Sequence, residues 1–301
     1  MSKFLIIVGG ATATGKTEMA IKLAQHFETE ILSADSRQFY REMTIGTAKP
    51  NTEELAAAKH HFINSLSIHD EYSVGDFEQD ALQLLDAIFE KKDVAIMAGG
   101  SGLFIRAVCE GLDEFPDVPN EIRDQLDLDF EKNGLEFLQK ELAERDPEYF
   151  EKVDQQNPVR LIRALSVIRV SGQPFSNFLN QEKPKRSFTP IYILLDMDRE
   201  KLYDKINRRV DLMMEKGLLE EARSLHAYKK LTSLQTVGYQ EFMRYFDGNW
   251  TLEKAVEMIK QNSRRYAKRQ MTWFRKRPYW KRFESGDFEG VINSSEALMK
   301  N

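Results

Sequence analysis

A segment near the start of the chain has the residue types and the spacing of a phosphate-binding loop. It follows the pattern GxxxxGK[ST] and consists of Gly10, Ala11, Thr12, Ala13, Thr14, Gly15, Lys16 and Thr17. In such a loop, backbone N–H groups and the start of a helix bind a phosphate chain, the lysine reaches the more distal phosphate, and the hydroxyl holds Mg²⁺. The pattern indicates a polyphosphate ligand without saying which one, or what is done to it.

The segments on either side of this phosphate loop are the ones that the motif requires. Residues 4–8 form an apolar run typical of a buried strand, and residues 18–24 have the composition of a helix. A glycine-rich turn that binds nothing is the alternative. The strand, the spacing and the pair Lys16 and Thr17 together favour phosphate binding.

Two more segments are expected to end at the same edge of the sheet. Residues 30–38 read as a second strand that ends in a polar loop carrying Asp35, and residues 93–102 read as a buried strand followed by a Gly-Gly-Ser-Gly turn. Because the carboxyl ends of parallel strands line the ligand crevice, we expect Asp35 near the bound phosphates, and we expect the turn with Ser101 to bring backbone and a hydroxyl close to a ligand in the same crevice. Asp35 could hold Mg²⁺ or act as a general base; the alternative is that it only stabilises its loop.

Other residues that could bind a metal are weaker candidates. Asp196 ends the apolar run 193–196 and could order Mg²⁺, as a strand-end carboxylate does in typical ATPases. His60 and His61 are adjacent, so on a strand they would point to opposite faces, and we interpret them as structural. Cys109 is the only cysteine, which excludes an intrachain disulfide and a cysteine-based metal cluster.

The charge of the chain is unevenly distributed. The net charge is −5, yet residues 260–282, the basic arm, hold ten Lys and Arg and no Asp or Glu; subtracting these ten charges leaves −15 for the rest. Aromatic residues such as Tyr266, Trp273 and Trp280 alternate with the basic ones, which suits stacking on bases and contacts to phosphates. The alternative is a solvated helix that packs its aromatic side chains on the core, and both can hold at once.

The order of the segments predicts an α/β fold, with a parallel sheet core like that of P-loop NTPases, flanked by helices, and a helical insertion. We expect the core to consist of residues 1–114 and 188–301, and the insertion of residues 115–187, which begin with a hinge-like stretch rich in proline. Helices are predicted at 52–59 capped by Thr52, 73–92 capped by Ser73, 199–225, and 253–268 capped by Thr251.

Nothing in the sequence indicates export or insertion into a membrane. The apolar run 4–8 is too short for a signal peptide, and no stretch approaches the length of a membrane span. We therefore expect a cytoplasmic protein that does not bind membranes. A monomer is the simplest expectation for its oligomeric state.

Short blocks along nearly the whole chain resemble those of bacterial tRNA dimethylallyltransferases, a family of tRNA isopentenyltransferases. In order, the blocks are GATATGKT, SADSRQFYREMTIGTAKP, HHFI, YSVGDF, AGGSGLF, NPVRLIRALSV, RRVDLMMEKGLLEE, TVGYQE and SRRYAKRQMTWFR, and they extend to about residue 275. The phosphate loop alone is shared by many families. The SADSRQ, GTAKP and AKRQ-TWFR blocks together are specific.

The resemblance implies transfer of a dimethylallyl group from dimethylallyl diphosphate to N6 of the adenosine just 3′ of the anticodon in tRNA, with Mg²⁺ as cofactor. It implies that residues 10–17 and Arg209 bind the diphosphate, with the Thr17 hydroxyl on the side of the metal. Asp35 matches the family's general base. Ser101 stands where the family usually has threonine, and it keeps the hydroxyl.

The resemblance also implies a set of residues that contact tRNA, with the insertion gripping the anticodon stem-loop while the target base leaves its stack. They are Asp35, Ser36, Arg37, Gln38, Ser101, Arg123, Val159, Arg160, Leu161, Ile162, Arg163, Gly238, Tyr239, Lys268 and Arg269. Lys205 stands where the family often has arginine, which affects only a secondary contact to the diphosphate.

Two rival interpretations use the same phosphate loop. A small-molecule kinase would share the fold and an acidic residue after the second strand, but it accounts for neither the basic arm nor the acidic insertion. A non-enzymatic RNA-binding protein that uses a nucleotide as a switch would leave Asp35 without a purpose. The kinase interpretation predicts phosphoryl transfer from ATP, and the resemblance predicts prenyl transfer to RNA.

Overall fold

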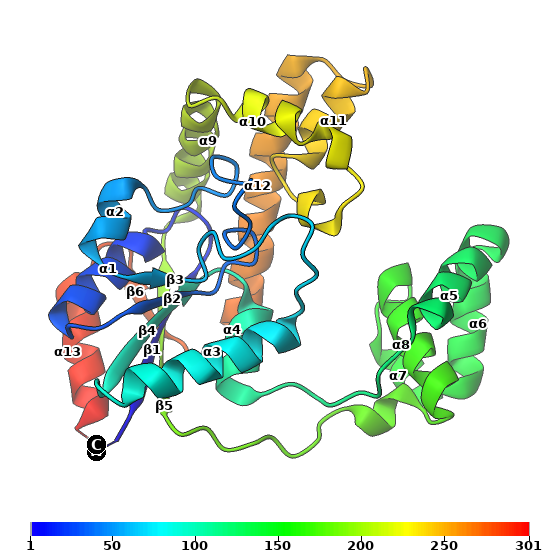
Figure 1. Ribbon diagram of the computed structural model, residues 1–301, viewed down its shortest axis with the longest axis horizontal. Coiled ribbons are helices and arrows are strands. Elements are labelled where there is room, and N and C mark those ends of the chain that lie inside the picture. The colour runs from blue at the N-terminus through cyan, green and yellow to red at the C-terminus, as the bar shows by residue number, and fades with distance from the viewer. Residues whose placement is uncertain (1, 301) are drawn as a thin grey trace. The chain divides into compact units, whose positions relative to one another are not determined.

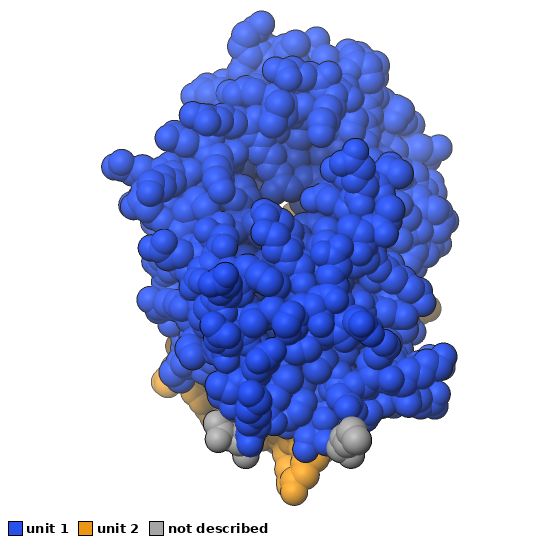
Figure 2. All heavy atoms as spheres, turned by 90° about the vertical axis from the view of Figure 1, so that its left-hand side faces the viewer, with its two compact units in different colours: residues 1–110, 186–301 blue, residues 111–185 orange. Residues whose placement is uncertain are grey.

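The computed structural model describes residues 2–300, which divide into two compact units. Unit 1 combines residues 1–110 with 186–301, and unit 2 is Gly111–Lys185; Figure 2 colours unit 1 blue and unit 2 orange. Within the described part of the chain, no helix is both long enough and apolar enough to cross a membrane.

Unit 1 is built on one sheet of six strands in which every neighbouring pair is parallel (Figure 1). The strands are β1 (Phe4–Gly10), β2 (Ile31–Ser33), β3 (His60–His61), β4 (Val94–Gly99), β5 (Thr189–Asp196) and β6 (Lys281–Glu284). Their order across the sheet is β3-β2-β4-β1-β5-β6. The predicted parallel sheet core is confirmed.

The central strand β1 is buried on both faces. Leu5 and Ile7 contribute to one hydrophobic cluster, Ile6 and Val8 contribute to another, and all four side chains are fully buried. A parallel strand covered on both sides needs apolar residues at every position, not at alternate ones. This explains why a continuous apolar run predicted the strand.

Helices cover both faces of the sheet, as Figure 1 shows. The cluster that contains Leu5 takes side chains from α3 (Val74–Phe89), α4 (Gly102–Glu110), α9 (Arg199–Glu215) and α12 (Leu252–Arg275). The cluster that contains Ile6 takes side chains from α1 (Lys16–His26) and α13 (Phe288–Met299). The shorter elements of unit 1 are α2 (Thr52–Ala57), α10 (Leu218–Ser224), α11 (Gln240–Phe246), η2 (His226–Tyr228) and η3 (Thr232–Leu234).

Two of the three predicted N-caps are confirmed. Ser73 and Thr251 cap α3 and α12, each accepting a hydrogen bond from a backbone N–H in the first turn. The prediction of Thr52 as a cap was wrong, because Asn51 is the cap of α2 and accepts from the backbone N–H of Glu54 at 2.8 Å. The Glu54 side chain bonds back to the N–H of Asn51, which completes a capping box.

The predicted continuous helix over residues 199–225 is wrong in one respect. It is broken into α9 and α10 at Gly217, which has φ = 95°. Glycine adopts this left-handed conformation without steric cost and commonly ends helices. The apolar periodicity continues across the break and therefore concealed it.

The end of the chain holds two elements that the sequence did not predict, β6 and α13. Strand β6 pairs only with β5 at the edge of the sheet, and three of its four residues are exposed, so it lacks an alternating pattern. Before it, the basic arm turns inward, since the side chains of Phe274 and Trp280 are buried in the core. Part of the aromatic content of the arm therefore serves packing.

Unit 2 has a hydrophobic core of its own. The helices of the unit are α5 (Asn120–Asn133), α6 (Leu135–Arg145), α7 (Pro147–Lys152), α8 (Pro158–Ser171) and η1 (Phe175–Phe178). Leu138 and Leu161 are fully buried in this core. Arg169 on α8 bonds Asp129 at 3.1 Å and Glu141 at 2.6 Å, which joins α8 to α5 and α6.

Gly99, at the end of β4, has no room for a side chain. A Cβ there would lie 2.1 Å from the carbonyl oxygen of Ala34, whereas a Cβ at Gly75 in α3 would lie 3.5 Å from its nearest neighbour, Ser73 Oγ. We expect Gly99→Ala to destabilise unit 1 by about 1–3 kcal/mol. Gly75→Ala is the matched control and should be neutral or stabilise by up to about 1 kcal/mol. Urea unfolding midpoints measure both, and equal midpoints would contradict the expected clash.

Candidate active site

A pocket of about 530 Å³ lies in unit 1, and all its lining residues belong to that unit. Figure 2 shows that one face of unit 1 is hollowed near its middle. The walls of the pocket come from the phosphate loop, the polar loop after β2, the end of β4, α9, residues 236–238 and α12. The expected convergence of strand ends at one crevice is present.

The phosphate loop has the backbone conformation that its glycines allow. Gly10 has φ = 152° and Gly15 has φ = 85°, and Ala13 is left-handed at φ = 66°. Ala11 and Thr14 are fully buried, and the Thr14 hydroxyl donates to the carbonyl of Ala11 at 2.9 Å, so both face the protein. Of the eight predicted loop residues, those that line the pocket are Thr12, Ala13, Gly15, Lys16 and Thr17.

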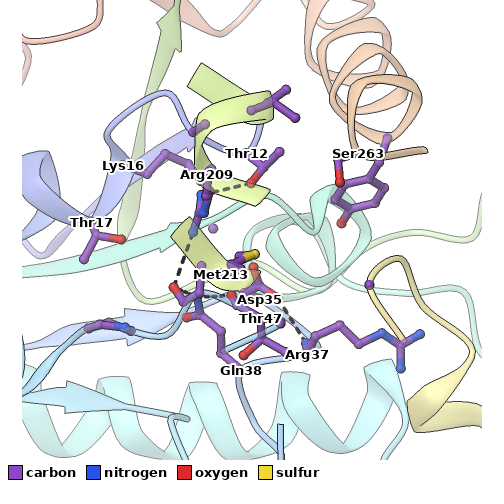
Figure 3. Close-up of a pocket in the computed structure, with 18 of the residues that line it drawn as sticks. Thr12, Lys16, Thr17, Asp35, Arg37, Gln38, Thr47, Arg209, Met213 and Ser263 are labelled. Atoms are coloured by element: carbon purple, nitrogen blue, oxygen red, sulfur yellow. Dashed lines mark hydrogen bonds between the residues drawn. The ribbon is translucent and has the colours of Figure 1, made fainter. Parts of the chain in front are cut away.

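Two cations lie close together in this pocket. Lys16 Nζ donates to the carbonyl of Ala11 at 2.7 Å, and burial lowers the pKa of Lys16 to about 8, opposed by the nearby Asp35 carboxylate and assisted by Arg209. Arg209 donates to Thr12 Oγ1 at 3.2 Å and to the carbonyl of Ala48 at 3.4 Å. Figure 3 shows its guanidinium between Thr12 and the loop that carries Thr47. Burial also lowers the pKa of Arg209.

Asp35 lies at the other side of this cation pair, on the loop after β2. Its Oδ1 accepts from the backbone N–H of Arg37 at 3.1 Å, which Figure 3 shows as a dashed line. Among residues 2–300, no group donates a hydrogen bond to Oδ2. That oxygen is therefore available to accept a proton.

Ser101 and Tyr266 lie next to Asp35. The Ser101 hydroxyl accepts from the backbone N–H of Ser36 at 3.3 Å, and it also hydrogen-bonds the hydroxyl of Tyr266. Burial, followed by the charge of Asp35, raises the pKa of Tyr266 to about 12, so the phenol stays protonated near neutral pH. Tyr266 lines the pocket, and the sequence had indicated it only as one aromatic residue of the basic arm.

Gln270 on α12 lines the pocket, although the sequence did not single it out. Its Oε1 accepts from the backbone N–H of Thr12 at 2.9 Å, and its Nε2 donates to the carbonyl of Gly100 at 3.0 Å. The side chain thus joins the phosphate loop to the glycine-rich turn after β4. An uncharged polar residue at a core-facing position of a helix was the one available signal, since Gln270 is 7% exposed.

Several residues that were predicted to contact tRNA hold loops in this structure. The Arg37 guanidinium donates to the carbonyls of Thr232 and Ser233 at 3.3 and 3.1 Å. Gln38 Nε2 donates to the carbonyls of Thr47 and Ala48, both at 3.3 Å. These bonds hold the polar loop after β2 against two neighbouring loops.

The other predicted tRNA residues differ in exposure. Lys268, Arg269, Arg123, Arg160 and Arg163 are exposed, as is Val159 at 74%, and Gly238 lines the pocket. The side chains of Leu161 and Tyr239 are fully buried in the cores of their units. Those two side chains cannot reach a ligand, so any contact at these positions would have to involve the backbone. Ile162 is half-buried.

The weaker metal candidates have structural partners. Asp196 pairs with the guanidinium of Arg275 at 3.0 Å and does not line the pocket. His61 Nε2 bonds the Glu30 carboxylate at 2.6 Å, and His60 Nδ1 bonds the carbonyl of Ala58 at 2.8 Å. Across the described chain, no group of three or more His, Cys, Asp and Glu side chains could hold a metal ion.

Thr17 and Asp35 supply hard oxygen donors to the pocket. Such a small set suits Mg²⁺, which binds proteins through one or two oxygen ligands and takes the rest from water and substrate phosphates. The residues present therefore fit a Mg²⁺ ion that arrives with a diphosphate, and they do not fit a closed protein site.

Comparison with known proteins gives consistent matches. Residues 38–277 match the family model described as IPP transferase. A tRNA dimethylallyltransferase from Christiangramia forsetii is 57% identical over 284 residues, covering 94% of this chain and 94% of that protein. Another, from Flavobacterium johnsoniae, is 50% identical over 298 residues, covering 97% of this chain and 96% of that protein.

Solved structures give the same result. The full-length tRNA isopentenylpyrophosphate transferase from Bacillus halodurans has a TM-score of 0.73 and 35% identity, covering 100% of this chain and 96% of that chain. A eukaryotic dimethylallyltransferase acting on tRNA has a TM-score of 0.82 and 25% identity, covering 99% of this chain and 78% of that chain.

The lowered pKa of Lys16 predicts that anion binding depends on pH. Since this pKa is about 8, Lys16 loses its proton as the pH rises past about 8, and binding should weaken. We expect the Kd for inorganic pyrophosphate to rise by up to about tenfold per pH unit above this value. Calorimetric titration at a series of pH values measures it.

Lys16→Arg is the matched control, because arginine keeps its charge throughout this range. The ratio of the two Kd values removes the titration of pyrophosphate itself. A ratio that stays constant between about pH 7 and 9 would show that Lys16 does not titrate there.

Proposed function

The chain belongs to the IPP transferase family, and from this premise we propose that it transfers a dimethylallyl group from dimethylallyl diphosphate to N6 of the adenosine 3′-adjacent to the anticodon in tRNA. The observation that carries the proposal is the meeting of Lys16 and Arg209 with Asp35 in one pocket. The cations suit a diphosphate leaving group, and the carboxylate suits the proton of an amine.

On the leaving-group side, the C–O bond to the diphosphate breaks and its electron pair moves onto the bridging oxygen. Lys16, Arg209 and the N–H groups at the start of α1 stabilise that developing charge. Burial disfavours the charged forms of Lys16 and Arg209, as their lowered pKa values indicate. The negative charge of a bound diphosphate would offset this loss of hydration.

On the nucleophile side, N6 forms a bond to the allylic carbon and loses a proton. The lone pair of the exocyclic amine is delocalised into the adenine ring, so the amine needs a base within hydrogen-bond reach. Asp35 is assigned as this base, because its Oδ2 has no donor in the described part of the chain. Ser101, which is bonded to Ser36 and Tyr266, holds the loop of the base in place and presents its hydroxyl beside it.

Mg²⁺ is the proposed cofactor. When bound, it would neutralise charge on the diphosphate, and the Thr17 hydroxyl would hold it on the protein side, which leaves Asp35 to act as the base. Thr17 lines the pocket beside Lys16 at the start of α1.

The pocket also has an apolar wall, which suits a prenyl chain. Ile206, Val210 and Met213 of α9 line it together with Val237 and Ile259. A nucleoside triphosphate would place a polar ribose and base in this space. The wall therefore favours an isoprenoid diphosphate over ATP as the ligand of the phosphate loop.

For tRNA we propose two contact regions. One is the exposed face of α12, with Lys268 and Arg269, next to the rim of the pocket where Arg37 and Gly238 lie. The other is the helical insertion, residues 115–187, which would bind the anticodon stem-loop through the exposed Arg123, Arg160, Arg163 and Val159. We propose that the active form is a cytoplasmic monomer.

The first experiment separates this proposal from the kinase alternative. The protein and Mg²⁺ are incubated with unmodified tRNA and with either labelled dimethylallyl diphosphate or labelled ATP. Label that enters tRNA only from the isoprenoid supports the transferase. Phosphoryl transfer or hydrolysis of ATP, with no transfer from the isoprenoid, would favour the kinase.

We expect Asp35→Asn to reduce turnover by roughly two to four orders of magnitude, the usual contribution of a general base. Asparagine keeps an oxygen that can accept from the N–H of Arg37, so the loop and the affinity for tRNA should be retained. Asp70→Asn is the matched control, because Asp70 also accepts from a loop N–H but does not line the pocket. Unchanged turnover of Asp35→Asn would remove this residue from the mechanism.

Replacement of Lys268 and Arg269 by glutamine should weaken tRNA binding and make it less sensitive to salt. Each lost phosphate contact lowers the slope of log Kd against log salt by about 0.7–0.9. Lys91→Gln with Lys92→Gln, in the turn after α3, removes the same charge away from the pocket and serves as the control. Equal salt slopes for the two double variants would assign α12 a structural role only.

A further inference from the structure

Glu221 on α10 lies outside the pocket, yet its carboxylate accepts four hydrogen bonds from two loops. Its Oε2 accepts from the backbone N–H groups of Thr44 and Ile45, at 3.0 and 2.8 Å. Its Oε1 accepts from the N–H of Gly46 at 3.0 Å and from the hydroxyl of Tyr239 at 2.6 Å. Within the described chain Glu221 makes no salt bridge, so these four donors and the nearby charge of Lys49 stabilise its carboxylate.

The two loops fit closely around this carboxylate. A Cβ on Gly46 would lie 2.6 Å from ring atoms of Tyr239, so only glycine allows the contact. Burial raises the pKa of Tyr239, which keeps its hydroxyl protonated and donating. Glu241 in turn accepts from the N–H of Gly238 at 2.8 Å and from Asn262 at 2.7 Å, which fixes the turn before Tyr239.

The loop held by Glu221 continues directly into the pocket. Thr47 and Ala48 line it, and the carbonyl of Ala48 accepts from Arg209 at 3.4 Å. The carbonyl of Thr47 accepts from Gln38, which lies in the same polar loop as Asp35. Glu221 is therefore connected to Arg209 through two hydrogen bonds and the backbone between Gly46 and Ala48.

We infer that Glu221 is a positioning residue of the reaction. By holding the N–H groups of residues 44–46, it sets the carbonyl of Ala48 that directs the Arg209 guanidinium at the diphosphate. The inference rests on the proposed function, in which Arg209 binds that diphosphate. Loss of Glu221 should therefore reduce affinity for the diphosphate through Arg209 and leave the base chemistry of Asp35 intact.

The test variant is Glu221→Gln. Glutamine has nearly the size of glutamate, but its NH₂ group is a donor and faces N–H or O–H groups that need an acceptor. The variant therefore loses some of the four hydrogen bonds of Glu221. The probe is inorganic pyrophosphate, titrated calorimetrically into the full chain. We expect its Kd to rise about fivefold to fiftyfold, while tRNA affinity is retained. Glu220→Gln, an exposed neighbour on the same helix, is the matched control and should not change Kd.

A double-mutant cycle decides whether Glu221 acts through Arg209. Arg209→Ala alone should weaken pyrophosphate binding, and adding Glu221→Gln should weaken it no further. Additive losses would overturn the inference, as would a lowered unfolding midpoint with unchanged pyrophosphate affinity. If Glu221→Gln does not fold, Tyr239→Phe removes one donor and must give the same non-additivity with a smaller loss. The cycle involves no prenyl transfer, so failure of the transfer assay would refute the proposed function separately.

Discussion

The pocket depends on one buried amide, the side chain of Gln270. It accepts from the N–H of Thr12 at 2.9 Å and donates to the carbonyl of Gly100 at 3.0 Å, so only one orientation of the amide satisfies both groups. A side chain at Gly100 would displace this amide, because a Cβ there would lie 2.1 Å from its nitrogen. Gln270 follows the exposed Lys268 and Arg269 on α12. The same helix therefore carries the surface proposed for RNA and the side chain that binds the phosphate loop.

The charges in the pocket favour a negatively charged ligand. Burial disfavours the charged forms of Lys16 and Arg209, and the nearby carboxylate of Asp35 only partly compensates for it. A diphosphate would complete the compensation, and it would also raise the pKa of Lys16 above its value of about 8 in the free protein. Burial of the Lys16 charge therefore has two effects. It lowers the pKa of Lys16, and it favours the binding of a negatively charged ligand.

Local patterns in the sequence were sufficient to predict the parts of the structure that depend on local physics. The phosphate loop, the caps Ser73 and Thr251 and the central strand were predicted because a few adjacent residues determine them. Gln270 and Glu221 were not, because their partners lie 258 and 177 residues away in the chain, and nothing local indicates such a contact. Strand β6 was missed for a related reason, since an exposed edge strand of charged residues has no apolar period.

A phosphate loop serves many reactions, so the groups opposite it decide which reaction follows. In phosphoryl transfer the nucleophile attacks phosphorus, and a strand-end carboxylate commonly orders the metal. Here the candidate for that role, Asp196, is engaged by Arg275 outside the pocket. In alkyl transfer the nucleophile attacks the carbon that is bonded to the diphosphate, so the base must lie near that end of the diphosphate, and the rest of the prenyl chain needs an apolar wall. Asp35 with its free oxygen, and the side chains of Val210 and Met213, line the same pocket as the phosphate loop and meet both requirements.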